Sequence, residues 1–189
     1  MAPRIQDHQT IVKTEFVAAL EQLLNERPLE KISVKDIAEY SGLSRRSFYN
    51  HFKDINDLVA YKHERGGEAV KALCPQWFDS PTALTLSFVY LQENRAFYRQ
   101  AFKYRGQNSL RQTFVDEITR ELISHFDESE LDRELVCALQ VLARTVVFLA
   151  ERYVTTDFPA TPEQMARLVM SCMPVSVAKY VGKMNGTET

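Results

Sequence analysis

The side chains best suited to chemistry in this sequence lie between residues 44 and 53, where two arginines and a lysine occur without any acid. At about 100° per residue in a helix, Arg46 and Asn50 point to one side, nearly opposite Phe48 and Phe52. An arginine can bind guanine and an asparagine can bind adenine, each through two hydrogen bonds in the major groove. This face therefore predicts the reading of DNA bases.

Other polar residues flank this pair and suit contacts to the DNA backbone, because hydroxyl, imidazole and ammonium groups bind phosphate oxygens. Arg45 can contact either bases or phosphates. The residues expected to contact the backbone are Ser33, Ser44, Ser47, Tyr49, His51 and Lys53. The competing interpretation is a packing module whose arginines are only exposed to solvent, because short motifs of this kind also occur without DNA binding.

Two short helices joined by a tight turn must hold these side chains in place. The first is expected to begin at Ser33, which can cap it together with Asp36, and to end at Gly42, which can adopt a left-handed conformation. The second is expected to begin at Ser44, another capping residue. A longer helix over about residues 10–26 carries an apolar stripe that can cover this pair. The pattern predicts a three-helix head that contains a helix-turn-helix.

Four runs in the first third of the chain together resemble the signature of the TetR/AcrR family of transcriptional regulators: residues 34–38, 41–44, 48–53 and 57–58. Three segments, residues 44–49, 93–98 and 106–109, resemble the subgroup similar to regulators of dihydroxyacetone kinase operons. The resemblance implies a DNA-binding head followed by a C-terminal sensing part. The family usually has a phosphate-contacting lysine early in the fourth helix, where this sequence has Ile55, so Lys53 is the expected substitute.

The overall composition describes a globular protein with no global attraction to DNA. Of 189 residues, 45% are hydrophobic, and 23 basic against 25 acidic residues give a net charge of −2. Any affinity for nucleic acid must therefore come from a local patch. The amino terminus lacks a secretory pattern, and no stretch is long and uncharged enough to span a bilayer. These features predict a cytoplasmic protein with no membrane contact.

The sequence contains none of the motifs that would indicate an enzyme. It has no glycine-rich phosphate loop, no nucleophile elbow and no pair of histidines with metal-ligand spacing, so no catalytic residue, cofactor or metal is expected. Cys74, Cys137 and Cys172 are odd in number and widely separated, which argues against disulfides and metal clusters. Each is expected to be a small buried hydrophobic residue.

The remaining two thirds of the chain are predicted to sense a ligand. Gly66 and Gly67 are expected to loosen or end the fourth helix, although a flexible point that moves the head is the alternative. Aromatic residues are dense between residues 77 and 114, and such a cluster can line a pocket or simply fill a core. The residues expected to line a pocket are Phe88, Phe97, Phe102 and Phe114.

The last two predicted helices suggest a dimer. Over about residues 131–154 apolar side chains occupy more than one helical face, and Thr161 opens a final helix with a capping box. Two such helices from each of two chains can form a four-helix interface. The residues expected in this homodimer interface are Leu139, Leu142, Val146, Met165, Leu168, Val169 and Cys172. Pro174 is expected to kink or end the final helix.

We therefore predict an all-α protein of about nine helices. Residues 8–53 are expected to form the DNA-binding head and residues 54–181 the ligand-sensing and dimerising body, while residues 1–7 and 182–189 are expected to be disordered. The predicted function is that of a dimeric repressor of a palindromic double-stranded DNA operator, released by a small effector. The alternative is an interaction protein whose C-terminal part senses a partner protein and which can act as an activator.

Overall fold

A computed structural model describes residues 5–74, 81–106 and 109–178, and these residues are helical without any strand. Two short 3-10 turns, Leu29–Lys31 and Glu128–Glu130, lie between the α-helices. The α-helices are α1 (Ile5–Glu26), α2 (Val34–Ser41), α3 (Arg45–His51), α4 (Ile55–Leu73), α5 (Pro81–Glu93), α6 (Arg95–Ala101), α7 (Leu110–Ile123), α8 (Arg133–Thr155) and α9 (Pro162–Ser171). This arrangement confirms the predicted all-α class.

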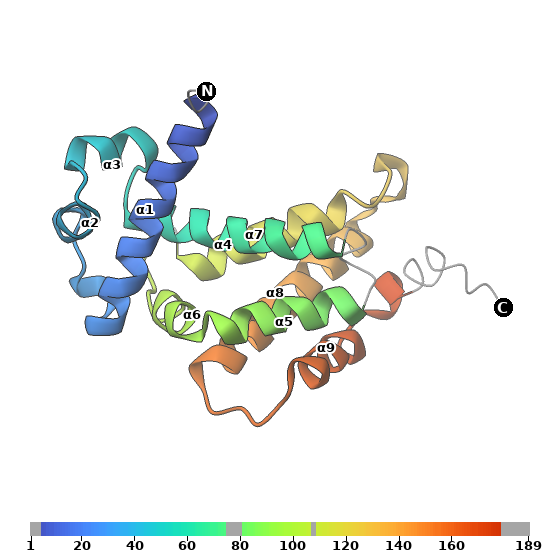
Figure 1. Cartoon of the computed structure of the whole chain (residues 1–189). Coiled ribbons are helices and arrows are strands. Elements are labelled where there is room, and N and C mark those ends of the chain that lie inside the picture. The colour runs from blue at the N-terminus through green and yellow to red at the C-terminus, as the bar shows by residue number, and fades with distance from the viewer. Residues whose placement is uncertain (1–4, 75–80, 107–108, 179–189) are drawn as a thin grey trace.

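Helices α1–α3 form a small unit at one end of the molecule (Figure 1). Its core is a cluster of three phenylalanines, in which the Phe16 ring lies 5.3 Å from Phe48 and 6.3 Å from Phe52. Phe16 and Phe48 are completely buried. The Phe16 ring of α1 packs against both Phe48 of α3 and Phe52 at its end. These contacts set the orientation of α3 relative to α1.

The predicted helix ends in this unit are confirmed. Ser33 and Asp36 form a capping box at the start of α2, and Gly42 ends that helix with φ of 69°, a left-handed conformation that glycine adopts without strain. The Ser44 hydroxyl accepts a hydrogen bond from the backbone N–H of Ser47 at the start of α3. Helix α1 is the exception, because it begins at Ile5 and not near residue 10. Residues 5–7, which were expected to be disordered, are therefore helical.

The body is built around α8, which packs against α5, α6, α7 and α9. Helix α4 leads from the small unit into the body, where it contacts α5 and α7 (Figure 1). The central position of α8 explains why its apolar residues occupy several faces, because most of them pack against other helices of the same chain. Within the described ranges, no helix is both long enough and apolar enough to cross a bilayer.

The prediction that α4 ends or loosens at its two glycines is wrong, because the helix continues without interruption to Leu73. The glycine at 66 has a packing role instead. A Cβ built there would lie 2.3 Å from Cε1 of Tyr90, so only glycine allows the α5 side chain to approach α4 so closely. Gly67 has open space at the same position.

The prediction that the cysteines are buried is also wrong for Cys137 and Cys172, which are exposed, while Cys74 is half-buried. Cys137 lies on the outer face of α8, and Cys172 follows the end of α9. Pro174 does separate two helical segments, since α9 ends at Ser171 and a new turn begins at residue 175. The predicted disorder of residues 182–189, and of residues 1–4 at the other end, lies outside the described residues.

Candidate nucleic-acid interface and pocket of the body

The outward face of α3 presents the two residues predicted to read bases. Arg46 and Asn50 are both exposed, one turn apart, on the side of the helix away from the buried Phe48. Arg45 is exposed next to them, and Tyr49 exposes 52% of its surface while its ring edge contacts Phe48. These four side chains are accessible to solvent on one side of the helix.

The remaining predicted contacts lie around this face. Ser44 and Lys53 are exposed at the two ends of α3, and Ser47 and His51 are half-buried along its edge. Because the Ser44 oxygen accepts the capping bond, its hydroxyl proton is still available to a phosphate. The structure thus brings together all the predicted DNA-contacting residues except one.

Ser33 is the exception, because its hydrogen-bonding groups are already used within α2. Its hydroxyl donates to Oδ2 of Asp36 over 2.6 Å, and its backbone N–H donates to the same oxygen over 2.8 Å. The Ser33 hydroxyl, the Ser33 N–H and the nearby Arg27 hold the pKa of Asp36 below its usual value. Ser33 therefore sits beside a carboxylate that stays charged, which favours a capping role over a phosphate contact.

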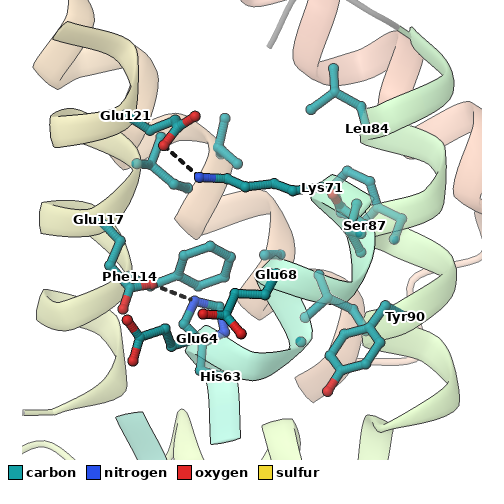
Figure 2. A pocket seen from close by; sticks show the side chains of 18 of the residues that line it. His63, Glu64, Glu68, Lys71, Leu84, Ser87, Tyr90, Phe114, Glu117 and Glu121 are labelled. Atoms are coloured by element: carbon teal, nitrogen blue, oxygen red, sulfur yellow. Dashed lines mark hydrogen bonds and ion pairs between the residues drawn. The ribbon is translucent and has the colours of Figure 1, made fainter. Parts of the chain in front are cut away.

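The body contains a cavity of about 430 Å³ between α4, α5, α7 and α8 (Figure 2). Phe88 and Phe114 line it, in agreement with their predicted positions. Phe97 and Phe102 are instead buried on either side of Tyr98, with ring centroids 5.1 Å and 6.3 Å from it, and neither belongs to the described cavity wall.

Polar groups of three helices meet at one end of this cavity. Nε2 of His63 on α4 lies 3.1 Å from a carboxylate oxygen of Glu117 on α7, and Nδ1 of His63 lies 3.1 Å from the Tyr98 hydroxyl on α6. Burial, followed by the nearby Tyr90 and Glu117, raises the pKa of Tyr98 well above its usual value. Tyr98 therefore stays neutral and can donate to Nδ1, which leaves Nε2–H of His63 to donate to Glu117.

A second polar link crosses the cavity further along α4. The ammonium of Lys71 lies 2.5 Å from a carboxylate oxygen of Glu121 on α7, as Figure 2 shows. The aromatic pattern of the sequence did not reveal this pair or His63 and Glu117. The available signal was the i, i+4 spacing of two pairs of carboxylates, at residues 64 and 68 and at residues 117 and 121.

A buried lysine next to His63 connects the cavity helix to the small N-terminal unit. Lys62 forms an ion pair with Glu21 of α1 and donates a hydrogen bond to Oδ1 of Asn94, at the start of α6, over 3.1 Å. Its ammonium also lies 5.0 Å from the centre of the Phe97 ring. His63 therefore faces the cavity, while the adjacent Lys62 contacts the N-terminal unit. A shift of α4 would change the contacts of both residues.

The residues predicted for the dimer interface occupy different environments. Leu139, Leu142, Met165 and Val169 are buried within the chain, Val146 and Leu168 are half-buried, and Cys172 is exposed. The outer face of α8 instead exposes Cys137, Val141 and Phe148, with 52% and 56% of the surface of the last two accessible. The sequence could not distinguish this strip, because α8 is apolar on almost every side.

Comparisons with known proteins match both parts of the chain. A family model described as "Bacterial regulatory proteins, tetR family" matches residues 16–61, and one described as "Transcriptional regulator C-terminal region" matches residues 79–174, about half of the chain. The HTH-type dhaKLM operon transcriptional activator DhaS of Lactococcus lactis subsp. lactis is 23% identical over 146 residues, which cover 71% of this chain and 76% of the relative.

A solved structure, that of the dihydroxyacetone kinase operon activator DhaS, has the same fold. It superimposes with a TM-score of 0.62 at 18% sequence identity, and the match covers 90% of this chain and 96% of the other. The similarity therefore extends through the N-terminal unit and the body together.

Proposed function

This chain belongs to the TetR family of bacterial transcriptional regulators, and from this premise we propose that it is a homodimer that binds a palindromic operator and releases it when a small molecule occupies the cavity. In this proposal α1–α3 form the reading head, and α4–α9 form the body that senses and dimerises. The observation that carries it is the outward face of α3, where Arg46 and Asn50 are exposed above a buried Phe48.

Within the head, Arg46 and Asn50 read bases, while Tyr49, His51, Lys53 and the Ser44 hydroxyl bind phosphates. Replacing Asn50 with alanine should remove about 1–3 kcal/mol of discrimination at one base pair. Replacing Lys53 with alanine should weaken binding to all sequences equally and reduce its dependence on salt, because one phosphate contact is lost.

The test is a titration of each variant against a panel of single base-pair changes in the operator, at two salt concentrations. Lys53→Ala serves as the matched control for Asn50→Ala, since both residues are exposed on or next to α3. If Asn50→Ala leaves the discrimination at every position unchanged, Asn50 does not read a base.

Two heads are needed to read a palindrome, and the apolar strip on the outer face of α8 supports a dimer. Cys137, Val141 and Phe148 lie at helical spacing on that face, with the exposed Arg144 between the last two. Unpartnered apolar side chains in such a row are typical of an interface, and twofold dimers are the most common oligomers. Half-sites would then lie one helical turn of DNA, or a multiple of it, apart.

The change Phe148→Glu should convert the dimer to a monomer and abolish tight operator binding, because a carboxylate would be buried opposite its own copy. Phe158, 38% exposed in the loop between α8 and α9, provides the control Phe158→Glu, which should leave the dimer intact. Sedimentation analysis of both variants checks the expectation. A dimer that tolerates Phe148→Glu would place the interface elsewhere.

Release of the operator would follow from the position of α4. This helix lines the cavity with His63 and Lys71 and contacts the head through the ion pair between Lys62 and Glu21. A ligand that favours a shifted α4 would change the spacing of the two heads. It could lower the affinity for DNA only by as much as it prefers the shifted state.

The second candidate is an activator, which the activator role of the Lactococcus relative favours. Activation and repression use the same DNA-binding cycle, because the position of the operator relative to the promoter decides the outcome. A body that senses a partner protein is the matching alternative to a small effector. The cavity of about 430 Å³ supports a small molecule, since sites of this volume are typical of such ligands.

A further inference from the structure

The charges on the cavity wall indicate which kind of small molecule it suits, an inference that rests on the effector role proposed above. The wall carries four carboxylates in two pairs on α4 and α7, each pair one helical turn apart: Glu64 and Glu68, Glu117 and Glu121. It also carries two permanent cations, Lys71 and Arg120. Four negative charges against two positive ones leave a net charge of −2 when His63 is neutral.

Ion pairs compensate only part of this negative charge. Lys71 pairs with Glu121 across the cavity, and Arg65 pairs with Glu68 along α4. The pair of Lys71 and Glu121 lies further along α4. Figure 2 shows Glu68 at the same end as His63, Glu64 and Glu117, where its partner is Arg65. The negative potential is therefore concentrated at the end of the cavity where Glu64 and Glu117 lie.

At that end a carboxylate adjoins an aromatic surface. The centroids of the His63 and Phe114 rings are 4.0 Å apart, and Glu117 accepts from the edge of His63. Glu64 is exposed there, and Figure 2 shows its carboxylate close to Glu117 and His63. Aromatic rings and carboxylates together bind ammonium and guanidinium groups, through the ring quadrupole and through charge-assisted hydrogen bonds.

The opposite wall of the cavity is mostly apolar, and Ser87 and Tyr90 of α5 are its polar members. Its apolar part is formed by Leu84, Phe88 and Leu91 of α5 and by Val146 and Ala150 of α8. A ligand that fills the whole space must therefore combine a positive group with an apolar body. We propose that the cavity binds an organic cation, with an apolar or aromatic body against α5 and α8 and an ammonium or amidinium group between Glu64 and Glu117.

The test is a calorimetric titration of the full-length protein at neutral pH with three compounds that share one naphthyl body: naphthylmethylammonium, naphthylmethanol and naphthoate. The ammonium should bind, the alcohol should bind about tenfold more weakly, and the carboxylate should give no heat of binding. The variant Glu117→Gln should remove most of the preference for the ammonium over the alcohol.

Two further variants test whether the preference for the ammonium depends on the charge of the cavity carboxylates or on a change in folding. Glu64→Gln changes an exposed residue and should reduce the same preference, whereas Glu93→Gln, an exposed carboxylate at the end of α5, should not. The proposal is overturned if no compound binds, if the alcohol or the carboxylate binds as tightly as the ammonium, or if Glu117→Gln and Glu64→Gln both leave the preference unchanged.

Failure of the cation site and failure of the regulator function give different results. Operator binding by the ligand-free protein is measured without any compound, so its failure concerns the head or the dimer and not the cation site. Binding of the ammonium without release of the operator would preserve the cation site and contradict the effector role. Release by the ammonium, but not by the alcohol at the same concentration, would support both.

Discussion

The interiors of the head and the body differ in the kind of group that they enclose. The head is closed around Phe16, Phe48 and Phe52, and its charged residues lie at the surface. In the part of the chain that the structure describes, the buried charged or titratable side chains outside the tyrosines are Lys62, His63 and Glu151, all in the body. The head thus has a closed aromatic core, whereas the body keeps a cavity crossed by polar contacts.

The largest expected effect is on the free energy of unfolding, when one phenylalanine of the head and one of the body are each replaced with alanine. Phe48→Ala should reduce the free energy of unfolding by about 3–5 kcal/mol, because it removes a completely buried ring from a closed core. Phe114→Ala should reduce it by clearly less, since Phe114 is half-buried and already faces the cavity. Chemical denaturation of both variants measures the difference. Equal losses would mean that the cavity wall is packed as tightly as the head.

A smaller effect distinguishes the two adjacent glycines of α4. Gly67→Ala should raise the free energy of unfolding by about 0.4–1 kcal/mol, because alanine restricts the unfolded chain and its methyl group meets open space. Gly66→Ala should be less stable than Gly67→Ala by about 1 kcal/mol or more, because its methyl group would overlap the Tyr90 ring.

Thermal unfolding of the two glycine variants provides the measurement. Gly66, Gly67 and Tyr90 all line the cavity, but only Gly66→Ala would displace the Tyr90 ring, so it should change ligand binding more than Gly67→Ala does. Identical stabilities for the two variants would show that Tyr90 moves away at no cost and that the contact between α4 and α5 is loose.

The smallest difference in stability is expected between variants of the caps of α3 and α9, which are chemically alike. Ser44→Ala and Thr161→Ala should each cost about 1 kcal/mol, because each removes the side-chain oxygen that accepts from a backbone N–H. Only Ser44→Ala should also weaken DNA binding, since its hydroxyl lies at the proposed interface. A loss of DNA affinity in Thr161→Ala of the same size would indicate that general destabilisation causes both effects.

The difference between the head and the body also explains which features could be predicted from the sequence. The head depends on local signals: caps at Ser33 and Ser44, a glycine at 42 and apolar spacing over a few turns, all of which the structure confirms. The cavity depends on contacts between four helices, which no local pattern specifies. Gly66 was interpreted as a helix breaker because its partner, Tyr90, lies on another helix.

The outer strip of α8 was missed for a similar reason. An apolar residue such as Leu139 or Leu142 can serve equally well in a dimer interface or in the core of one chain. Only the packing of α8 among its neighbours shows that these two are buried internally, while Val141 and Phe148 face outward.

The most direct test of the account is a binding selection from genomic DNA fragments, performed at moderate salt with the wild-type protein and with the Arg46→Ala, Asn50→Ala double variant. The wild type should enrich a palindromic motif. The double variant should not, although it should still fold and dimerise because both substitutions are on the exposed face of α3. A motif that the double variant still enriches, or the absence of any motif with the wild type, would contradict the central claim that α3 reads DNA.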